Sequence, residues 1–205
     1  TRDAQATLDQ IRRLTAAGAD LVRVAVPQKE DTAALKTIVA ESPVPIIADV
    51  HFHFRRAMEA IEAGVHKIRL NPGNIKDRAQ VDEVIAACKE RGIAIRVGVN
   101  EGSVVERGDK QRRAAQKAAL ADDPHAQLVN LMVDTLEDYL AIFREHDFHD
   151  IVLSAKSIDP TVVISAYRVI SRRFDYPLHL GVTHAGPPET GRIRSIAALS
   201  ALLAD

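Results

Sequence analysis

Cationic side chains recur along the chain within or at the end of short apolar segments. The cationic residues are Arg23, Arg69, Arg96 and Lys156. A single carboxylate, that of Asp49, lies in one of the same segments. Guanidinium groups bind phosphate oxygens through paired hydrogen bonds, whereas burying unpaired cations costs several kcal/mol. If these side chains converge on one cavity, they need an anion, and a small polyanion such as a diphosphate fits the excess of positive charge. The alternative for any one of them is an internal salt bridge.

Uncharged polar residues in the same segments could complete a phosphate site. They are Asn71, Asn100, Ser154 and Thr183. The Asn-Pro-Gly-Asn turn at 71–74 follows an apolar segment and offers backbone amides to a phosphate. An ordinary Pro-Gly turn has the same sequence, so the turn alone does not distinguish the two interpretations.

A pair of histidines suggests a different chemistry. His51 and His53 have the His-x-His spacing that places two imidazoles on one side of an extended chain, as in metal-dependent barrel hydrolases. Lys156, His179 and His184 could extend such a site. The arginines disfavour it, because cations beside a divalent metal raise the energy of the site.

Length, charge and composition restrict the class of protein. The chain has 205 residues, 46% hydrophobic and 27% charged, which is typical of one globular domain. Its 27 Lys and Arg balance 28 Asp and Glu, so no general positive field for nucleic acid or anionic lipid is present. No apolar segment approaches the roughly 18 residues of a membrane helix, and no basic leader precedes a cleavage site. We therefore expect a soluble, cytoplasmic protein.

Cys88 is the only cysteine, and it lies within a helical pattern. It can form no intrachain disulfide, and one thiolate cannot hold a structural zinc or an iron-sulfur cluster, which need about three or four ligands. We expect a helix residue without chemistry, and no metal bound by residues 1–205.

Strand-length apolar segments alternate with amphipathic helical patterns along nearly the whole chain. The expected strands are 21–26, 45–51, 67–71, 93–100, 151–157 and 178–183. The expected helices lie near 3–17, 31–41, 54–63, 79–91, 124–145, 160–173 and 189–204. The charged, alanine-rich segment 101–123 interrupts this alternation, and we expect a mobile loop or a frayed helix there.

The two faces of the expected strands differ in polarity. One face is apolar throughout, whereas the other is polar in all six segments. Helices cover both faces of an open doubly wound sheet, so both would be apolar there. A barrel has helices only outside, so its lumen can be polar near the usual active site. We predict an α/β fold, a TIM-type (β/α)8 barrel in a single domain over 1–205; the alternative is a one-sided α+β sheet whose polar face meets water.

Five motifs, in order, resemble one family. They are Val-Arg-Val-Ala-Val-Pro at 22–27, Ile-Ala-Asp-Val-His-Phe at 47–52, Ile-Arg-Leu-Asn-Pro-Gly-Asn-Ile at 68–75, Ile-Arg-Val-Gly-Val-Asn at 95–100 and Leu-His-Leu-Gly-Val-Thr at 178–183. The family is 4-hydroxy-3-methylbut-2-enyl diphosphate synthase, and the resemblance runs from about residue 4 to 203. It implies a barrel that binds 2-C-methyl-D-erythritol 2,4-cyclodiphosphate in the methylerythritol phosphate route to isoprenoids.

The resemblance also implies a chemistry and a set of site residues. In this family a two-electron reductive ring opening with loss of water takes place at a [4Fe-4S] cluster held by a separate C-terminal domain. The implied diphosphate and hydroxyl ligands are Arg23, His51, Arg69, Asn71, Arg96, Asn100, Ser154 and Lys156. Asp49 would orient its neighbours, and Arg55 and Asn74 would be outer members. The implied partners are a ferredoxin or flavodoxin electron donor and a second subunit in a homodimer.

This chain departs from the family in three respects. The cysteine-bearing domain is absent, so we expect the chain to be inactive alone. The first and last barrel strands have no counterpart, which predicts a fragment with an incomplete barrel. His184 stands where the family pattern has a glutamate with a chemical role, and an imidazole there can still transfer a proton near neutral pH.

Three other functions stay open on this evidence. A metal-dependent hydrolase would use His51, His53, Lys156 and His179. A pterin- or phosphate-binding barrel of another pathway would share the arginines. A non-catalytic phosphate-ligand-binding module would keep the pocket without the chemistry, and His184 favours it.

Overall fold

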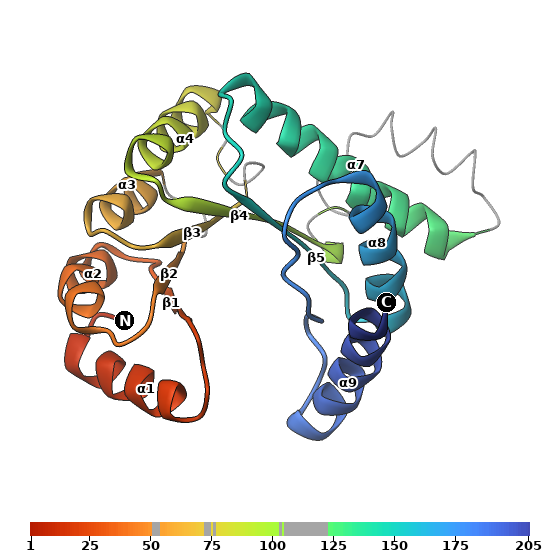
Figure 1. Cartoon of the computed structure of the whole chain (residues 1–205), viewed down its shortest axis with the longest axis horizontal. Coiled ribbons are helices and arrows are strands. Elements are labelled where there is room, and N and C mark those ends of the chain that lie inside the picture. The colour runs from red at the N-terminus through yellow and green to blue at the C-terminus, as the bar shows by residue number, and fades with distance from the viewer. Residues whose placement is uncertain (51–53, 72–74, 76, 103, 105–122) are drawn as a thin grey trace. The chain divides into compact units, whose positions relative to one another are not determined.

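Strands and helices alternate along the part of the chain that the computed structural model describes, residues 1–50, 54–71, 75, 77–102, 104 and 123–205 (Figure 1). The strands are β1 (Val22–Ala25), β2 (Ile46–Asp49), β3 (Lys67–Leu70), β4 (Ala94–Asn100) and β5 (Ile151–Lys156). The helices are α1 (Ala4–Ala16), α2 (Lys29–Glu41), α3 (Phe54–Glu62), α4 (Arg78–Arg91), α7 (Pro124–Glu145), α8 (Pro160–Arg173) and α9 (Pro188–Ala204). These residues form two compact units: unit 1 contains Thr1–Arg96 and Phe143–Ile151, and unit 2 contains Val97–Ile142 and Val152–Asp205.

The strand order distinguishes between the two α/β folds. The sheet has the order β1-β2-β3-β4-β5, and β1 with β2 and β2 with β3 are parallel pairs. A doubly wound sheet reverses its strand order at a switch point, whereas each strand here lies beside its successor. The order is that of strands in a (β/α)8 barrel, as predicted.

Unit 1 buries one face of its strands under helices. Val24, Ala48 and Ile68 are register partners across β1, β2 and β3, and each is buried. Helices α1 to α4 pack on one another in sequence and lie along the same side of these strands (Figure 1). The other face is mostly polar, although the buried Ile47 also lies on it, and it bears Asp49 and Arg69 as partners in the next register position.

Local sequence determines where several helices begin and end. The carboxylates of Asp3, Asp77 and Asp159 accept hydrogen bonds from backbone N–H groups in the first turns of α1, α4 and α8. Helix α4 ends at Gly92, whose φ of 63° is left-handed and favours glycine. The helix positions follow from these caps together with the amphipathic pattern.

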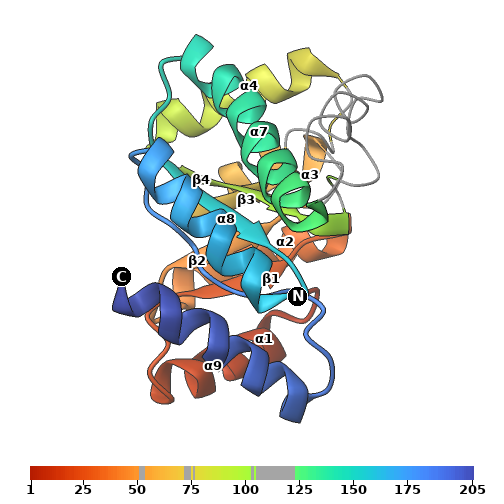
Figure 2. The same cartoon turned by 90° about the vertical axis from the view of Figure 1, so that its right-hand side faces the viewer.

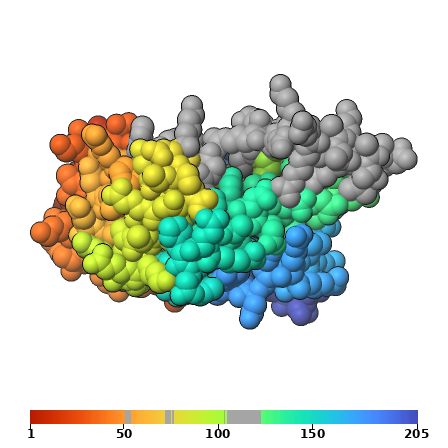
Figure 3. Space-filling view, turned by 90° about the horizontal axis from the view of Figure 1, so that it is seen from above, coloured from red at the N-terminus to blue at the C-terminus, as the bar shows by residue number. Residues whose placement is uncertain are grey.

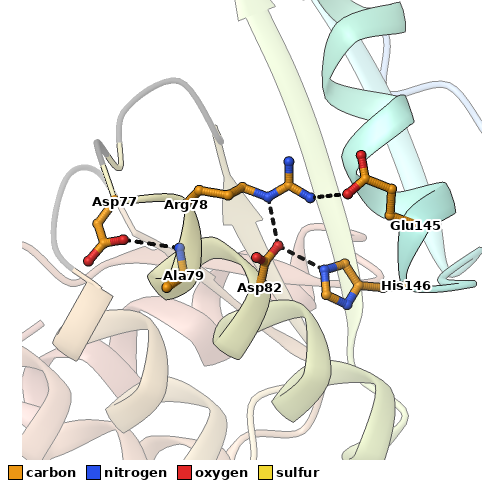
Figure 4. Close-up of polar contacts among 6 residues, drawn as sticks. All are labelled: Asp77, Arg78, Ala79, Asp82, Glu145 and His146. Carbon is orange, nitrogen blue, oxygen red and sulfur yellow. Dashed lines mark hydrogen bonds and ion pairs between the residues drawn. The ribbon is translucent and has the colours of Figure 1, made fainter.

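A polar network joins α4 to the residues that end α7, all within unit 1. Arg78 donates from Nε to Asp82 at 2.7 Å and from a terminal nitrogen to Glu145 at 2.6 Å, and Nε2 of His146 lies 2.8 Å from Asp82 (Figure 4). Lys89 donates to the carbonyl of His146 at 2.7 Å. The space-filling view shows α4 and the end of α7 side by side on the surface (Figure 3). The network therefore ties two helices that are distant in the sequence.

Unit 2 packs α8 against α9 (Figure 2). Tyr167 of α8 is 1% exposed, and its hydroxyl accepts a hydrogen bond from the backbone of Ala155 at 3.1 Å. The same hydroxyl donates to the carbonyl of His179. Tyr167 thus links α8 both to β5 and to the segment around His179.

The predicted helices and the first five predicted strands agree with the structure within two residues at either end. The predicted sixth strand, 178–183, is wrong as a regular strand: only Leu178 forms an isolated parallel bridge, to Leu153. Its predicted apolar face is half-buried rather than buried, and consists of Leu178, Leu180 and Val182. Within the described residues, its backbone hydrogen bonds to β5 involve Leu153 alone, whose N–H donates to Pro177 and whose carbonyl accepts from His179, and a regular ladder needs a longer succession of them.

Two further expectations concern the chain as a whole. Across the described ranges, no helix is long and apolar enough to cross a membrane. The expected loop or frayed helix falls largely on 105–122, which lies outside the described residues, and it stays a prediction.

Candidate functional site

One carboxylate organises the polar face of unit 1. Asp49, the last residue of β2, forms ion pairs with Arg23 of β1 at 2.9 Å and with Arg69 of β3 at 3.8 Å. The strand register explains this arrangement. On β3 the register partner of Asp49 is Arg69. On β1 its register partner is Ala25, which lies two residues after Arg23. The structure therefore brings together three of the residues proposed from the sequence.

Arg69 is the cation most affected by burial. Its side chain is 12% exposed, against 48% for Arg23. Burial lowers the pKa of Arg69, the Asp49 carboxylate opposes this, and the charge of Arg23 lowers the pKa further. The Nε of Arg69 is also buried, with no hydrogen bond to any described residue. One carboxylate shared by two guanidinium groups leaves a positive excess that an anion would relieve.

Two more of the expected ligands are buried in unit 1. Arg96 in β4 is 5% exposed, and Asn71, directly after β3, is 3% exposed. Arginine and asparagine side chains are seldom buried to this extent unless they serve a polar interior. Their burial agrees with a polar lumen rather than with a sheet face open to water.

Unit 2 contains a second set of the expected ligands. Ser154 and Lys156 are two residues apart in β5 and therefore share one face of this strand, and Ser154 is 3% exposed. A Cβ at Gly98 would lie 2.5 Å from Oγ of Ser154, so the glycine leaves room for this hydroxyl. Asn100 lies two residues after Gly98 and shares its face of β4. A hydroxyl, an amine and an amide thus lie on neighbouring strands.

The side chain of Glu101 was not predicted from the sequence to have a role. Its carboxylate accepts a 2.6 Å hydrogen bond from the hydroxyl of Ser157, and that hydroxyl also accepts one from the backbone N–H of Asp159 at 3.0 Å. The carbonyl of Ser157 in turn accepts a hydrogen bond from Thr183 N–H at 3.0 Å. The one available signal was the position of Glu101, directly after a strand end.

His184 lies in the loop before α9. Its side chain is exposed, and its φ of 48° is left-handed, which is uncommon outside glycine but tolerated by histidine. Its neighbour Thr183 bonds to the residue after β5, which places the loop beside the carboxyl end of that strand. Three other candidates, His51, His53 and Asn74, lie outside the described residues.

The described residues contain no cluster of side chains that could hold a metal ion. Nowhere in them do three or more His, Cys, Asp or Glu side chains gather as a metal site requires. Cys88 is fully buried in α4, and burial raises the pKa of its thiol to about 12. A lone, neutral thiol does not fit an iron-sulfur cluster, which needs several thiolate ligands.

Comparison with known proteins places this geometry in a family. The family model described as the GcpE TIM-barrel domain matches residues 1–205. The chain is 42% identical over 203 residues to the 4-hydroxy-3-methylbut-2-en-1-yl diphosphate synthase (flavodoxin) of Caulobacter vibrioides, covering 99% of this chain and 50% of that protein. It is 46% identical over 206 residues to the protein of the same name from Acidothermus cellulolyticus, covering 100% and 50%. The chain spans about half the length of the curated relatives it matches.

A solved structure supports the fold alone. A protein from Burkholderia cenocepacia J2315 described as a putative phosphonomutase superposes with a TM-score of 0.55 at 14% identity, covering 100% of this chain and 88% of that one. Together with the family match, this likeness confirms the predicted α/β barrel class.

Proposed function

Because the chain belongs to the GcpE TIM-barrel domain family, we propose that it is the substrate-binding barrel of a 4-hydroxy-3-methylbut-2-en-1-yl diphosphate synthase. In this proposal both units belong to one barrel domain. The barrel binds 2-C-methyl-D-erythritol 2,4-cyclodiphosphate, and the complete protein converts it to 4-hydroxy-3-methylbut-2-enyl diphosphate by taking up two electrons and releasing water.

The observation that carries the proposal is the cluster of Arg23, Asp49 and Arg69. Two guanidinium groups share one carboxylate, and the more buried of them retains an unsatisfied Nε. A diphosphate oxygen would provide this group with an acceptor and compensate the charge of both arginines. Arg96 and Asn71, buried in the same unit, extend the phosphate-binding set.

The second set would hold one phosphate oxygen and the uncharged part of the ligand. Lys156 suits a phosphate oxygen, because an ammonium group is a compact point charge. The Ser154 hydroxyl and the Asn100 amide can each donate and accept, which suits the hydroxyl groups of a sugar-derived ring. His51 and Asn74, outside the described residues, complete the proposed ligand set.

Asp49 and His184 have the proposed roles closest to the chemistry. Asp49 orients Arg23 and Arg69 through its two oxygens. His184 would hold or pass a proton during the ring opening, since an imidazole nitrogen can both accept and donate one.

The residues of this chain do not fit an iron-sulfur cluster, because its one cysteine is a buried, protonated thiol. We place the [4Fe-4S] cluster of the complete protein outside residues 1–205, so the barrel alone would bind without reducing. A flavodoxin or ferredoxin would supply the electrons, and a homodimer would bring one barrel to its partner's cluster.

Calorimetric titration of the complete protein with the cyclodiphosphate tests the proposal. Replacing Arg69 by alanine should weaken binding by about 1.5 to 3 kcal/mol, the value of a charge-assisted hydrogen bond. Arg91→Ala removes an exposed cation at the end of α4 and serves as the control. Lys89 suits this purpose less well, because it bonds to the carbonyl of His146. Equal affinity of Arg69→Ala and the wild type would contradict the proposal.

A further inference from the structure

A cationic cavity lies in unit 1, and neither Asp49 nor the arginines paired with it are among the described residues that line it. Its volume is about 450 Å³, and it is lined by Pro27, Gln28, Lys29, Phe54, Arg55, Arg56 and Gln80. Three of these residues are cationic and none is acidic. A cavity of this size can hold a small ligand, and its charge specifies an anion.

The cavity is built from three successive strand-to-helix connections. Residues 27–29 follow β1 and begin α2, residues 54–56 begin α3 after β2, and Gln80 lies in the first turn of α4 after β3. All of them therefore lie beyond the carboxyl ends of parallel strands. Barrel enzymes bind their substrates at this end of the strands, and here the same ends bear Asp49 and Asn71.

The charge of the cavity comes from two side chains. Arg56 is neutralised, because it pairs with Glu59 at 2.7 Å and is 13% exposed. The side chains of Lys29 and Arg55 are exposed, and neither forms an ion pair or a side-chain hydrogen bond with a described residue. The start of α2 adds little positive potential to the cavity. The backbone N–H of its N-cap residue, Gln28, already donates a hydrogen bond to the Asp31 carboxylate at 3.1 Å.

We propose that this cavity is an outer anion-binding subsite, where Lys29 and Arg55 capture a phosphate group of the incoming cyclodiphosphate before the arginines of the polar face bind it. The inference rests on the proposed function. Exposed cations attract an anion from a distance but hold it loosely, because water screens them. Lys29, Arg55 and Arg23 are all exposed, whereas the side chain of Arg69 is only 12% exposed. This series would pass the phosphate from a loosely held position to a tightly held one.

Stopped-flow measurement of cyclodiphosphate association with the complete protein tests the subsite. The double variant Lys29→Gln/Arg55→Gln should bind about three- to tenfold more slowly at low ionic strength, with a flatter dependence on salt. The control double variant is Arg13→Gln/Arg91→Gln. It removes two cations from the last turns of α1 and α4, which precede β1 and β4 and so lie at the opposite ends of the strands. Unchanged association in the first variant, or equal slowing in both, would overturn the inference.

Inorganic pyrophosphate separates this inference from the proposed function. In NMR spectra of the wild-type protein, it should shift the backbone amide signals of Lys29 and Arg55, and the double variant should lose these shifts. If the wild type failed to bind the cyclodiphosphate, the proposed function would fail, but shifts that depend on both cations would still support an anion subsite. Absence of any shift at these residues in the wild type would overturn it.

Discussion

The hydroxyl of Ser157 donates a 2.6 Å hydrogen bond to the carboxylate of Glu101, and so joins the residues that follow β5 and β4. Ser157 is fully buried, and its Oγ also accepts the backbone N–H of Asp159. Both strands contribute proposed ligands immediately before this contact, namely Asn100 and Lys156. The contact therefore holds the ends of two ligand-bearing strands in unit 2.

Replacing Ser157 by alanine should lower the free energy of unfolding by about 1.5 to 3 kcal/mol, because a buried hydroxyl bonded to a charged group is lost. Glu101→Gln keeps an acceptor and should cost less. Urea denaturation of the two single variants and the double variant measures the coupling between the two side chains. Strictly additive losses would show that the charge of Glu101 contributes nothing to this contact.

The elements of this fold could be predicted because their patterns are local. The periodicity of 124–145 and the aspartates before α1, α4 and α8 specify helices without reference to the remainder of the chain. Pairing is not local. The segment 178–183 has the alternation of a strand, yet only its first residues bond to β5, because pairing depends on which neighbours tertiary structure provides.

The site was predictable to a similar extent. Alternation assigned Arg23, Asp49 and Arg69 to one face, but only the structure shows that Asp49 forms ion pairs with both arginines. Glu101 was missed, because its partner lies 56 positions away and a residue after a strand end has no periodicity. The i, i+4 spacing of Arg78 and Asp82 predicts their pairing, whereas no pattern links Asp82 to His146, 64 positions later.

Asp49→Asn should destabilise the unliganded protein and increase its response to anions. Without the carboxylate, Arg23 and the more buried Arg69 repel each other, at a cost of about 1 to 3 kcal/mol after allowance for the exposure of Arg23. Millimolar pyrophosphate should restore part of this loss by binding the folded state. Urea denaturation with and without pyrophosphate is the measurement.

The control for this experiment is Asp175→Asn, an exposed carboxylate outside both ligand sets. It should change neither the stability nor the response to pyrophosphate. If pyrophosphate stabilised the wild type more than the Asp49 variant, the carboxylate would be acting as part of the anion site rather than as a competitor for its arginines.

The network on α4 predicts a pH dependence of stability. Hydrogen bonds from Arg78 and then His146 hold the pKa of Asp82 below its ordinary value of 3.8 (Figure 4). A carboxylate whose pKa is depressed by folding stabilises the fold above its unfolded pKa, and this contribution is lost as the pH falls from about 3.8 through the folded value. Asp82→Asn should therefore show a shallower acid decline in its free energy of unfolding.

Denaturant titrations between pH 5 and about 2.5 test this difference, and high salt should reduce it, because the groups are exposed. An acid decline in Asp82→Asn as steep as in the wild type would show that other carboxylates account for the whole of it.

His184 is the proposed catalytic position whose role is easiest to separate from binding. Its side chain is exposed in the loop before α9 and takes part in neither ion pair of Asp49, so substitution should leave the phosphate contacts in place. In the complete protein, His184→Ala should lower kcat while the Kd for the cyclodiphosphate stays nearly constant. His184→Glu should retain or raise turnover, because a carboxylate can also hold a proton at this position.

His184→Asn is the backbone control, since asparagine adopts the left-handed conformation that this residue has, at φ 48°, but does not titrate. It should lose turnover as the alanine variant does, and it should also lose any limb of the kcat–pH profile that the imidazole causes. If asparagine restored the kcat that alanine lost, His184 would act through its backbone conformation rather than as a proton carrier. If alanine abolished binding, His184 would be a phosphate ligand, and the proton would have to come from another group, for which Glu101, at a strand end in the same unit, is a candidate.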